Sequence, residues 1–206
     1  MILGIDPGTR MSGFVIYDPT TMAVVQAGKV SNRSLRAALR LARSTGITQV
    51  AIERFASYGK PIGEESLATI HEAGRMYEIL VAQGYLPRRV FRREVKKHLG
   101  LRNVGSGDAA VRGALIARTG LAPKDAIGTK AAPGPLYGVV GDAWAALAVA
   151  ITASEETPDK RPPTPRKPPR QALKAGGKRS RHAVERGRRS ALAIRTKRSR
   201  RNVSRR

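Results

Sequence analysis

The N-terminal part of the chain alternates apolar runs with short polar turns. Apolar runs cover residues 2–6, 12–17 and 23–30, and the segments PGTR and DPTT lie between them. Short runs of this kind, bounded by Pro, Gly and Asp, are typical of strands joined by tight turns. We therefore predict three strands, each antiparallel to the next.

The pattern then changes to helical spacing that alternates with further apolar runs. Residues 31–46 carry Leu35 and Leu39 on one helical face, and the run ITQVAIER predicts a fourth strand. Downstream, the spacing predicts a fifth strand over residues 88–92. It also predicts four helices, over residues 63–84, 95–100, 107–120 and 141–154. Elements in this order are typical of an α/β domain with a mixed five-stranded sheet flanked by helices, its first three strands antiparallel.

The end of the chain differs in composition from the rest. Residues 155–206 hold 19 Lys and Arg against 4 Asp and Glu, with many prolines, whereas residues 1–154 hold 20 against 11, a net charge of +9. We expect a folded domain over residues 1–154 and a disordered tail over residues 155–206, because the tail cannot bury enough apolar surface to fold alone. Since both parts are basic, the tail segment Lys160 to Arg206 is predicted to bind nucleic-acid phosphates; a solubilising or targeting tail is the alternative.

Other features of composition restrict the setting. The 206 residues include no cysteine, which excludes disulfides, zinc–thiolate sites and a thiol nucleophile. The longest apolar stretch, residues 139–153, is interrupted by Asp142 and is shorter than the ~20 residues of a membrane helix. No basic leader begins the chain. We expect a soluble, cytoplasmic protein with no membrane partner.

Three acidic residues stand at the ends of predicted elements. Asp6 ends the first apolar run, Glu53 lies at the end of the fourth, and Asp142 opens the last predicted helix. An ionised carboxylate at a strand end is costly to bury without compensation, and if the first and fourth strands are neighbours, two of the acids project from one edge. Three converging carboxylates suit Mg²⁺ or Mn²⁺, and two such ions ~3.5–4 Å apart can cleave phosphodiesters.

Several motifs occur in a characteristic order over residues 1–153: GIDPGT followed by SGFVIYD, AIERF before a long helix, RREVKKHLG, and DAWAALAVAI. Together they resemble the RuvC-like Holliday junction resolvases of the ribonuclease H-like superfamily, and most closely the phage-encoded members. The resemblance implies a ribonuclease H-like fold. It also implies a homodimeric endonuclease that resolves four-way junction DNA by paired nicks with two Mg²⁺ ions, acting in the cytoplasm, or in the host cytoplasm for a phage protein.

The same resemblance makes Asp6, Glu53 and Asp142 the catalytic metal ligands. Where many members carry a second ligand three residues into the last helix, this chain has Ala145. Either three carboxylates suffice, or Asp108 at another predicted helix start supplies the missing oxygen. Asp108 is equally explained as a first-turn acid that stabilises its own helix.

Further matches point to residues that bind DNA. Lys96 and Lys97 correspond to a basic stretch that faces the DNA strand in the family, although both also suit a solvated helix face. Arg54, Phe55 and Tyr58 follow the second acid, where the family often has an aromatic residue that stacks on an unpaired base. Packing in the core is the alternative for Phe55.

The long predicted helix bears on the expected dimer. A four-way junction has approximate two-fold symmetry, so paired nicks need two active sites related by a dyad. The helix over residues 64–83 resembles the interface helix of the family, and packing on the sheet is the alternative. Its apolar positions are Leu67, Ile70, Met76, Ile79 and Leu80.

Three other functions stay open. GIDPGT also resembles the phosphate motif of actin-like and sugar-kinase ATPases, but the chain shows no second copy of that motif. A flap, branched-DNA or RNA:DNA hybrid nuclease would keep the same fold and the same metal ions. A non-catalytic DNA-binding protein with a decayed site is the third, because Ala145 stands where a ligand is expected.

Overall fold

The computed structural model describes residues 1–42, 46–57, 59, 61–101 and 107–155. The predicted basic tail lies outside the described residues apart from its first position. The boundary between domain and tail therefore stays a prediction.

Five strands form one mixed sheet: β1 (Ile2–Asp6), β2 (Met11–Asp18), β3 (Ala23–Ser31), β4 (Gln49–Arg54) and β5 (Arg88–Phe91). Their order across the sheet is β3-β2-β1-β4-β5. β1, β2 and β3 are antiparallel neighbours, whereas β4 is parallel to β1 and β5 is parallel to β4. The predicted α/β class, with its mixed sheet and antiparallel first three strands, is confirmed.

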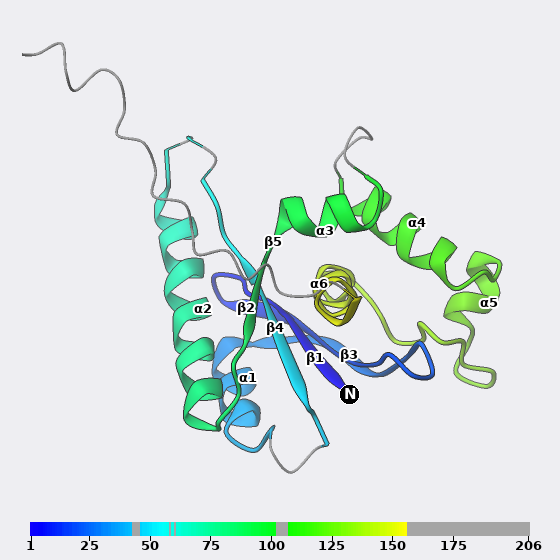
Figure 1. Cartoon of the computed structure of the whole chain (residues 1–206), viewed down its shortest axis with the longest axis horizontal. Helices are drawn as coiled ribbons and strands as arrows, with labels where there is room; N and C mark the ends of the chain where they lie inside the picture. The colour runs from blue at the N-terminus through cyan, green and yellow to red at the C-terminus, as the bar shows by residue number, and fades with distance from the viewer. Residues whose placement is uncertain (43–45, 58, 60, 102–106, 156–206) are drawn as a thin grey trace, which may run out of the picture. The chain divides into compact units, whose positions relative to one another are not determined.

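The described residues form six helices: α1 (Asn32–Leu39), α2 (Glu64–Ala82), α3 (Arg92–His98), α4 (Asp108–Arg118), α5 (Pro123–Ile127) and α6 (Ala143–Glu155). Figure 1 shows α1 and α2 on one face of the sheet and α6 on the other, with α3, α4 and α5 around α6. In the part of the chain that is described, every helix is too short or too polar to cross a membrane.

Three helices differ from the prediction, and one of them, α3, begins at Arg92, three residues before the predicted start. The sequence pattern missed α5, because a single turn that begins at a proline is too short to show an apolar period. α1 ends at Leu39, earlier than the predicted helix. The chain turns after Leu39 and still buries Ala42, so the apolar spacing is satisfied without a longer helix.

α6 forms most of the core on its side of the sheet. Nine of its 13 residues are buried, as expected for a helix that is apolar nearly all round. Gly4 in β1 allows its close approach, because a Cβ there would lie 2.2 Å from the carbonyl oxygen of Ala146 and 2.9 Å from the Cβ of Ala150. The direct contact between α6 and β1 fixes where the start of α6 lies relative to the end of β1.

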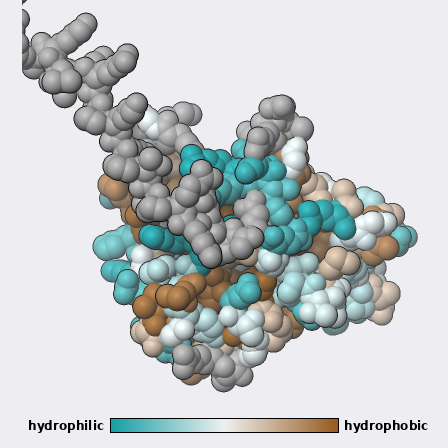
Figure 2. Space-filling model, in the orientation of Figure 1, coloured by the Kyte–Doolittle hydropathy of each residue, from teal (hydrophilic) through white to brown (hydrophobic). Residues whose placement is uncertain are grey.

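α2 has a buried side and an exposed apolar side. Met76 and Leu80 are fully buried in the cluster that joins α1 and α2 to the sheet. Leu67 and Ile70 are 55% and 40% exposed. In Figure 2, hydrophilic side chains gather over α3, whereas the side of the molecule where α2 runs shows both hydrophobic and hydrophilic side chains. Packing on the sheet thus accounts for only part of the apolar pattern of α2.

Candidate metal and nucleic-acid site

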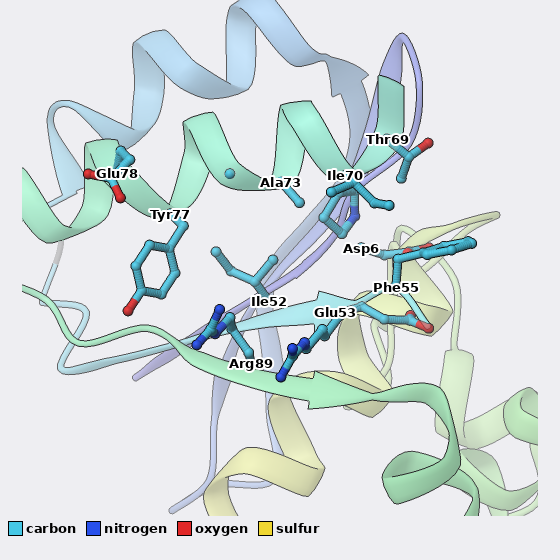
Figure 3. A pocket seen from close by; sticks show the side chains of 13 residues that line it. Asp6, Ile52, Glu53, Phe55, Thr69, Ile70, Ala73, Tyr77, Glu78 and Arg89 are labelled. Carbon is cyan, nitrogen blue, oxygen red and sulfur yellow. The ribbon is translucent and has the colours of Figure 1, made fainter. Parts of the chain in front are cut away.

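Asp6 and Glu53 lie side by side at one edge of the sheet. The parallel register pairs Ile5 of β1 with Ile52 of β4, so the next residue on each strand emerges at the same end. The two carboxyl groups share a hydrogen bond, and Figure 3 shows them together beside a hollow. The structure thus brings together two acids that are far apart in the sequence.

Burial and mutual repulsion control the ionisation of this pair. Burial, followed by the charge of Glu53, raises the pKa of Asp6 to about 8 despite the opposing charge of Arg92. Burial also raises the pKa of Glu53, again against Arg92. Two adjacent, partly buried carboxyls cannot both ionise easily without an added cation. A bound divalent ion would offset both the cost of burying the two negative charges and their mutual repulsion. The carboxyl pair therefore suits such an ion.

Asp142 lies next to the pair but is held by another residue. Its backbone oxygen accepts hydrogen bonds from the amides of Ala145 and Ala146, at 3.1 and 3.2 Å, which starts α6. Its Oδ2 lies 2.7 Å from Nζ of Lys29 in β3. The charge of Asp142 contributes to the raised pKa of Asp6. Lys29 was not predicted from the sequence, because only the pairing of strands in the sheet brings β3 to the site.

The three predicted ligands are therefore not gathered around one point. Among the described residues, no group of three Asp, Glu or His side chains is placed to hold a metal ion. Asp6 and Glu53 touch, whereas Asp142 is turned to Lys29. The donor set is nevertheless entirely oxygen, which is the chemistry that Mg²⁺ and Mn²⁺ prefer.

Arg92 stands between Glu53 and Asp108. Its Nη1 lies 3.7 Å from Oε2 of Glu53, and its Nη2 donates to Oδ1 of Asp108. Arg92 is the first residue of α3 and follows β5, which is parallel to β4, so it arrives beside the end of β4. Sequence reasoning missed Arg92, although its place as the last residue of a predicted strand was a usable signal.

Asp108 occupies the first turn of α4, as the helix-stabilising interpretation requires. Its side chain is 91% exposed, and its nearest described partner of opposite charge is Arg92. The charge of Asp108 adds to the raised pKa of Glu53, which places the two acids in one neighbourhood. Its role as a metal ligand stays a prediction.

Two hollows meet at the Asp6–Glu53 pair. The larger, of about 920 Å³, is bordered by α4 and α6 and is lined by all four acids, together with Arg92 and Ala145. The smaller, of about 620 Å³, runs beside α2, and Figure 3 shows Tyr77 and Arg89 at its wall. To the shared acid pair, the larger hollow, called the charged hollow below, adds Asp108, Asp142, Arg92 and Arg112. The smaller hollow adds the aromatic rings of Phe55 and Tyr77 together with Arg54, Glu78 and Arg89.

The residues after Glu53 border the smaller hollow. Phe55 is 41% exposed, so it does not pack in the core. The guanidinium of Arg54 lies 4.6 Å from the ring centre of Phe91. Tyr58 lies outside the described residues. The structure thus places an exposed aromatic and a cation next to the acids.

Of the basic residues in α3 and α4, Arg92 and Arg112 line the larger hollow. Lys96 is close enough for its charge to lower the pKa of Glu53, whereas Lys97 is exposed. Arg112, which the sequence did not single out, lines the larger hollow with its guanidinium 5.2 Å from the ring centre of Trp144. The segment Lys160 to Arg206 lies outside the described residues.

The loop after Asp6 is held by two buried polar side chains. Ser12 donates from Oγ to Oδ1 of Asn32 at 2.7 Å, and Asn32 donates from Nδ2 to the carbonyl of Gly8 at 2.9 Å. The Gly8 amide donates back to Ser12, at 3.2 Å. Because this amide is already bonded within the protein, the ATPase alternative, in which the glycine amides bind a nucleotide phosphate, is disfavoured.

No protein-family model and no curated protein matches the sequence. By structure, the chain is similar to T. thermophilus RuvC in complex with a Holliday junction substrate, with a TM-score of 0.51, 19% identity, and coverage of 74% of this chain and 91% of that chain. A second Thermus thermophilus RuvC structure has a TM-score of 0.46 at 19% identity, with coverage of 74% and 92%. Neither of these two structures bears on the resemblance to phage-encoded members. The first likeness shows that the chain has the ribonuclease H-like fold in the form seen in RuvC.

Proposed function

We propose that the protein is a Mg²⁺-dependent endonuclease that cleaves branched DNA, with the four-way junction as its main substrate. The proposal is carried by the touching carboxyls of Asp6 and Glu53 at the edge of a RuvC-like sheet. The structure to which the chain is similar is described as bound to a Holliday junction substrate, which supports this substrate class.

Asp6, Glu53 and Asp142 would hold the ion. A bound divalent cation supplies positive charge to the scissile phosphate and makes a water molecule more acidic. The chain contributes two carboxylates whose positions follow from the β1–β4 register, and a third on the residue that immediately precedes α6. Asp142 would join them by giving up its ion pair with Lys29, and the Lys29 ammonium would then be available to a DNA phosphate.

Basic side chains around the acids would position the DNA. Arg112 borders the charged hollow, the charge of Lys96 acts on Glu53, and Arg54 with Phe55 borders the other hollow. Contacts of this kind bind the phosphate backbone without reading sequence, which suits an enzyme that selects branched shapes. We assign the same role to the basic tail, so a chain ending at Glu155 should bind DNA more weakly and with a flatter salt dependence.

We also propose that two copies pair through α2. Leu67 and Ile70 form an exposed apolar strip on this helix, and a dyad there would provide the two active sites that paired nicks need. Light scattering of the full chain should give twice the monomer mass, and Leu67→Glu should shift it toward the monomer. A monomeric wild-type protein would contradict this proposal alone.

The first experiment is a gel cleavage assay with Mg²⁺. It compares a four-way junction, a flap, a Y-fork, a linear duplex and an RNA:DNA hybrid, with the Asp6→Asn variant as the control. Paired symmetric nicks in the junction, lost in the variant, support the resolvase. Equal cutting of flaps and forks indicates a broader branched-DNA nuclease. Binding without any cutting indicates a decayed site and contradicts the proposal.

A further inference from the structure

Arg92 lies inside the charged hollow. Its guanidinium faces Glu53 with one nitrogen and Asp108 with the other, and its side chain is only 24% exposed. The same hollow is lined by Asp6, Asp142 and the methyl group of Ala145. Arg92 is therefore a resident cation of the acidic centre, and its position follows from the end of β5.

The place of Arg92 competes with a second metal ion. An ion that bridges Glu53 and Asp108 would need the carboxylate oxygens that the guanidinium nitrogens face. The two cations would also repel each other strongly at such short range in a partly buried site. Ala145, which also lines the hollow, offers no side-chain oxygen that could help to hold a second ion.

We infer that Arg92 supplies the second positive charge of the catalytic centre, so that each centre uses one divalent ion and one guanidinium instead of two ions. The inference rests on the proposed endonuclease function and specifies how that centre neutralises its phosphate. In this arrangement Asp6, Glu53 and Asp142 would hold the ion. Arg92 would contact the scissile phosphate, and Asp108 would orient the Arg92 guanidinium.

A guanidinium is well suited to this task. It stays protonated at every working pH and presents a planar fork of donors that matches phosphate oxygens. In hydrolysis, the oxygen of water bonds to phosphorus, the bond from phosphorus to O3′ breaks, and one proton of the water ends on O3′. Arg92 keeps its own protons throughout and neutralises charge on the phosphate oxygens as it grows.

The test begins with a count of bound ions that needs no cleavage. Full-length protein is titrated with Mn²⁺, and free Mn²⁺ is followed by electron paramagnetic resonance. We expect one tight Mn²⁺ per wild-type chain. In Arg92→Gln, the loss of a competing cation should tighten that ion at least threefold. Two tight ions per wild-type chain, or no change in affinity in Arg92→Gln, would overturn the inference.

The second measurement is single-turnover cleavage of the four-way junction at saturating Mg²⁺. Arg92→Gln should cut at least 100-fold more slowly while binding the junction within about threefold of wild type. Arg92→Lys, which keeps the positive charge, should cut the junction at least tenfold faster than Arg92→Gln. Arg93→Gln is the matched control, since Arg93 is exposed and stacks on Phe91 instead of facing the acids.

The two proposals fail in different ways. If wild type cuts junctions and Arg92→Gln cuts equally well, the role of Arg92 is wrong and the endonuclease stands. The same conclusion follows if Arg92→Lys is as slow as Arg92→Gln, because the arginine then acts through structure. If wild type cuts no nucleic acid, the proposed function is wrong, and Arg92 loses its catalytic role with it.

Discussion

The acids that end strands and the acids that start helices are held in different ways. Asp6 and Glu53 emerge from adjacent parallel strands, contact each other and have raised pKa values. Asp142 and Asp108 stand at helix starts, and each faces a cation, Lys29 or Arg92. The sheet thus fixes the positions of one pair of carboxyls, whereas ion pairs hold the other two. The positions of Asp6 and Glu53 therefore follow from the strand pairing, whereas those of Asp142 and Asp108 depend on their ion pairs.

The largest expected effect comes from neutralising a strand acid. Asp6→Asn and Glu53→Gln should each slow junction cleavage at least about 1,000-fold, equivalent to about 4 kcal/mol, with binding nearly unchanged. Asp108→Asn, the matched change at a helix start, should cost less than about tenfold. Equal losses in a cleavage assay at saturating Mg²⁺ would erase the distinction between the two kinds of acid.

The link between the two kinds of acid is the contact of α6 with β1. Gly4→Ala should lower the free energy of unfolding by about 2–3 kcal/mol, because its Cβ would overlap the Ala146 carbonyl. Gly113→Ala in α4 is the control, since that position faces open space. Urea unfolding measures both. Equal stability of the two variants would show that α6 does not depend on this contact.

The strand pair should also make the metal-free protein sensitive to pH. The pKa of Asp6 is about 8 in the fold against an ordinary 3.8, so the folded state keeps a proton that the unfolded chain has lost. Stability should therefore fall as the pH rises from about 4 to about 8, by about 3 kcal/mol between pH 5.5 and 8.

Thermal unfolding in the presence of a chelator checks this dependence. Asp6→Asn should flatten it and raise the melting temperature at pH 8 by several degrees. Added Mg²⁺ should stabilise wild type at pH 8 but have less effect on the variant, because it binds the ionised pair. A wild-type protein whose stability rises over this pH range would contradict the assignment of a shared proton.

The smallest effect is expected at Lys29. Lys29→Ala removes an exposed ion pair, so the free energy of unfolding should change by less than about 1 kcal/mol. Because Asp142 no longer has to leave a lysine, Mg²⁺ should bind about threefold more tightly, as measured by calorimetry. Unchanged metal affinity would indicate that Asp142 does not join the strand pair.

The pattern of apolar runs and turn residues determined much of the fold and two of the four acids at the centre. Apolar runs with Pro and Gly turns predicted all five strands, and the placement of Asp6 and Glu53 at strand ends predicted that they would meet if β1 and β4 were neighbours. These features are readable because strand and turn preferences act between residues close in sequence. Helix α5 was missed because one turn carries too little of a pattern.

Only the tertiary structure decided which partners complete the acids. Lys29 reaches Asp142 across 113 positions of sequence, and Arg92 reaches Glu53 because β5 lies beside β4. Such ion pairs leave no trace in local periodicity, since the two side chains are set by strand order and by helix packing. The sequence alone determined that two acids stand at the ends of β1 and β4, and the strand order then brought them together. The packing of the sheet and of α6 decided which cations would share it.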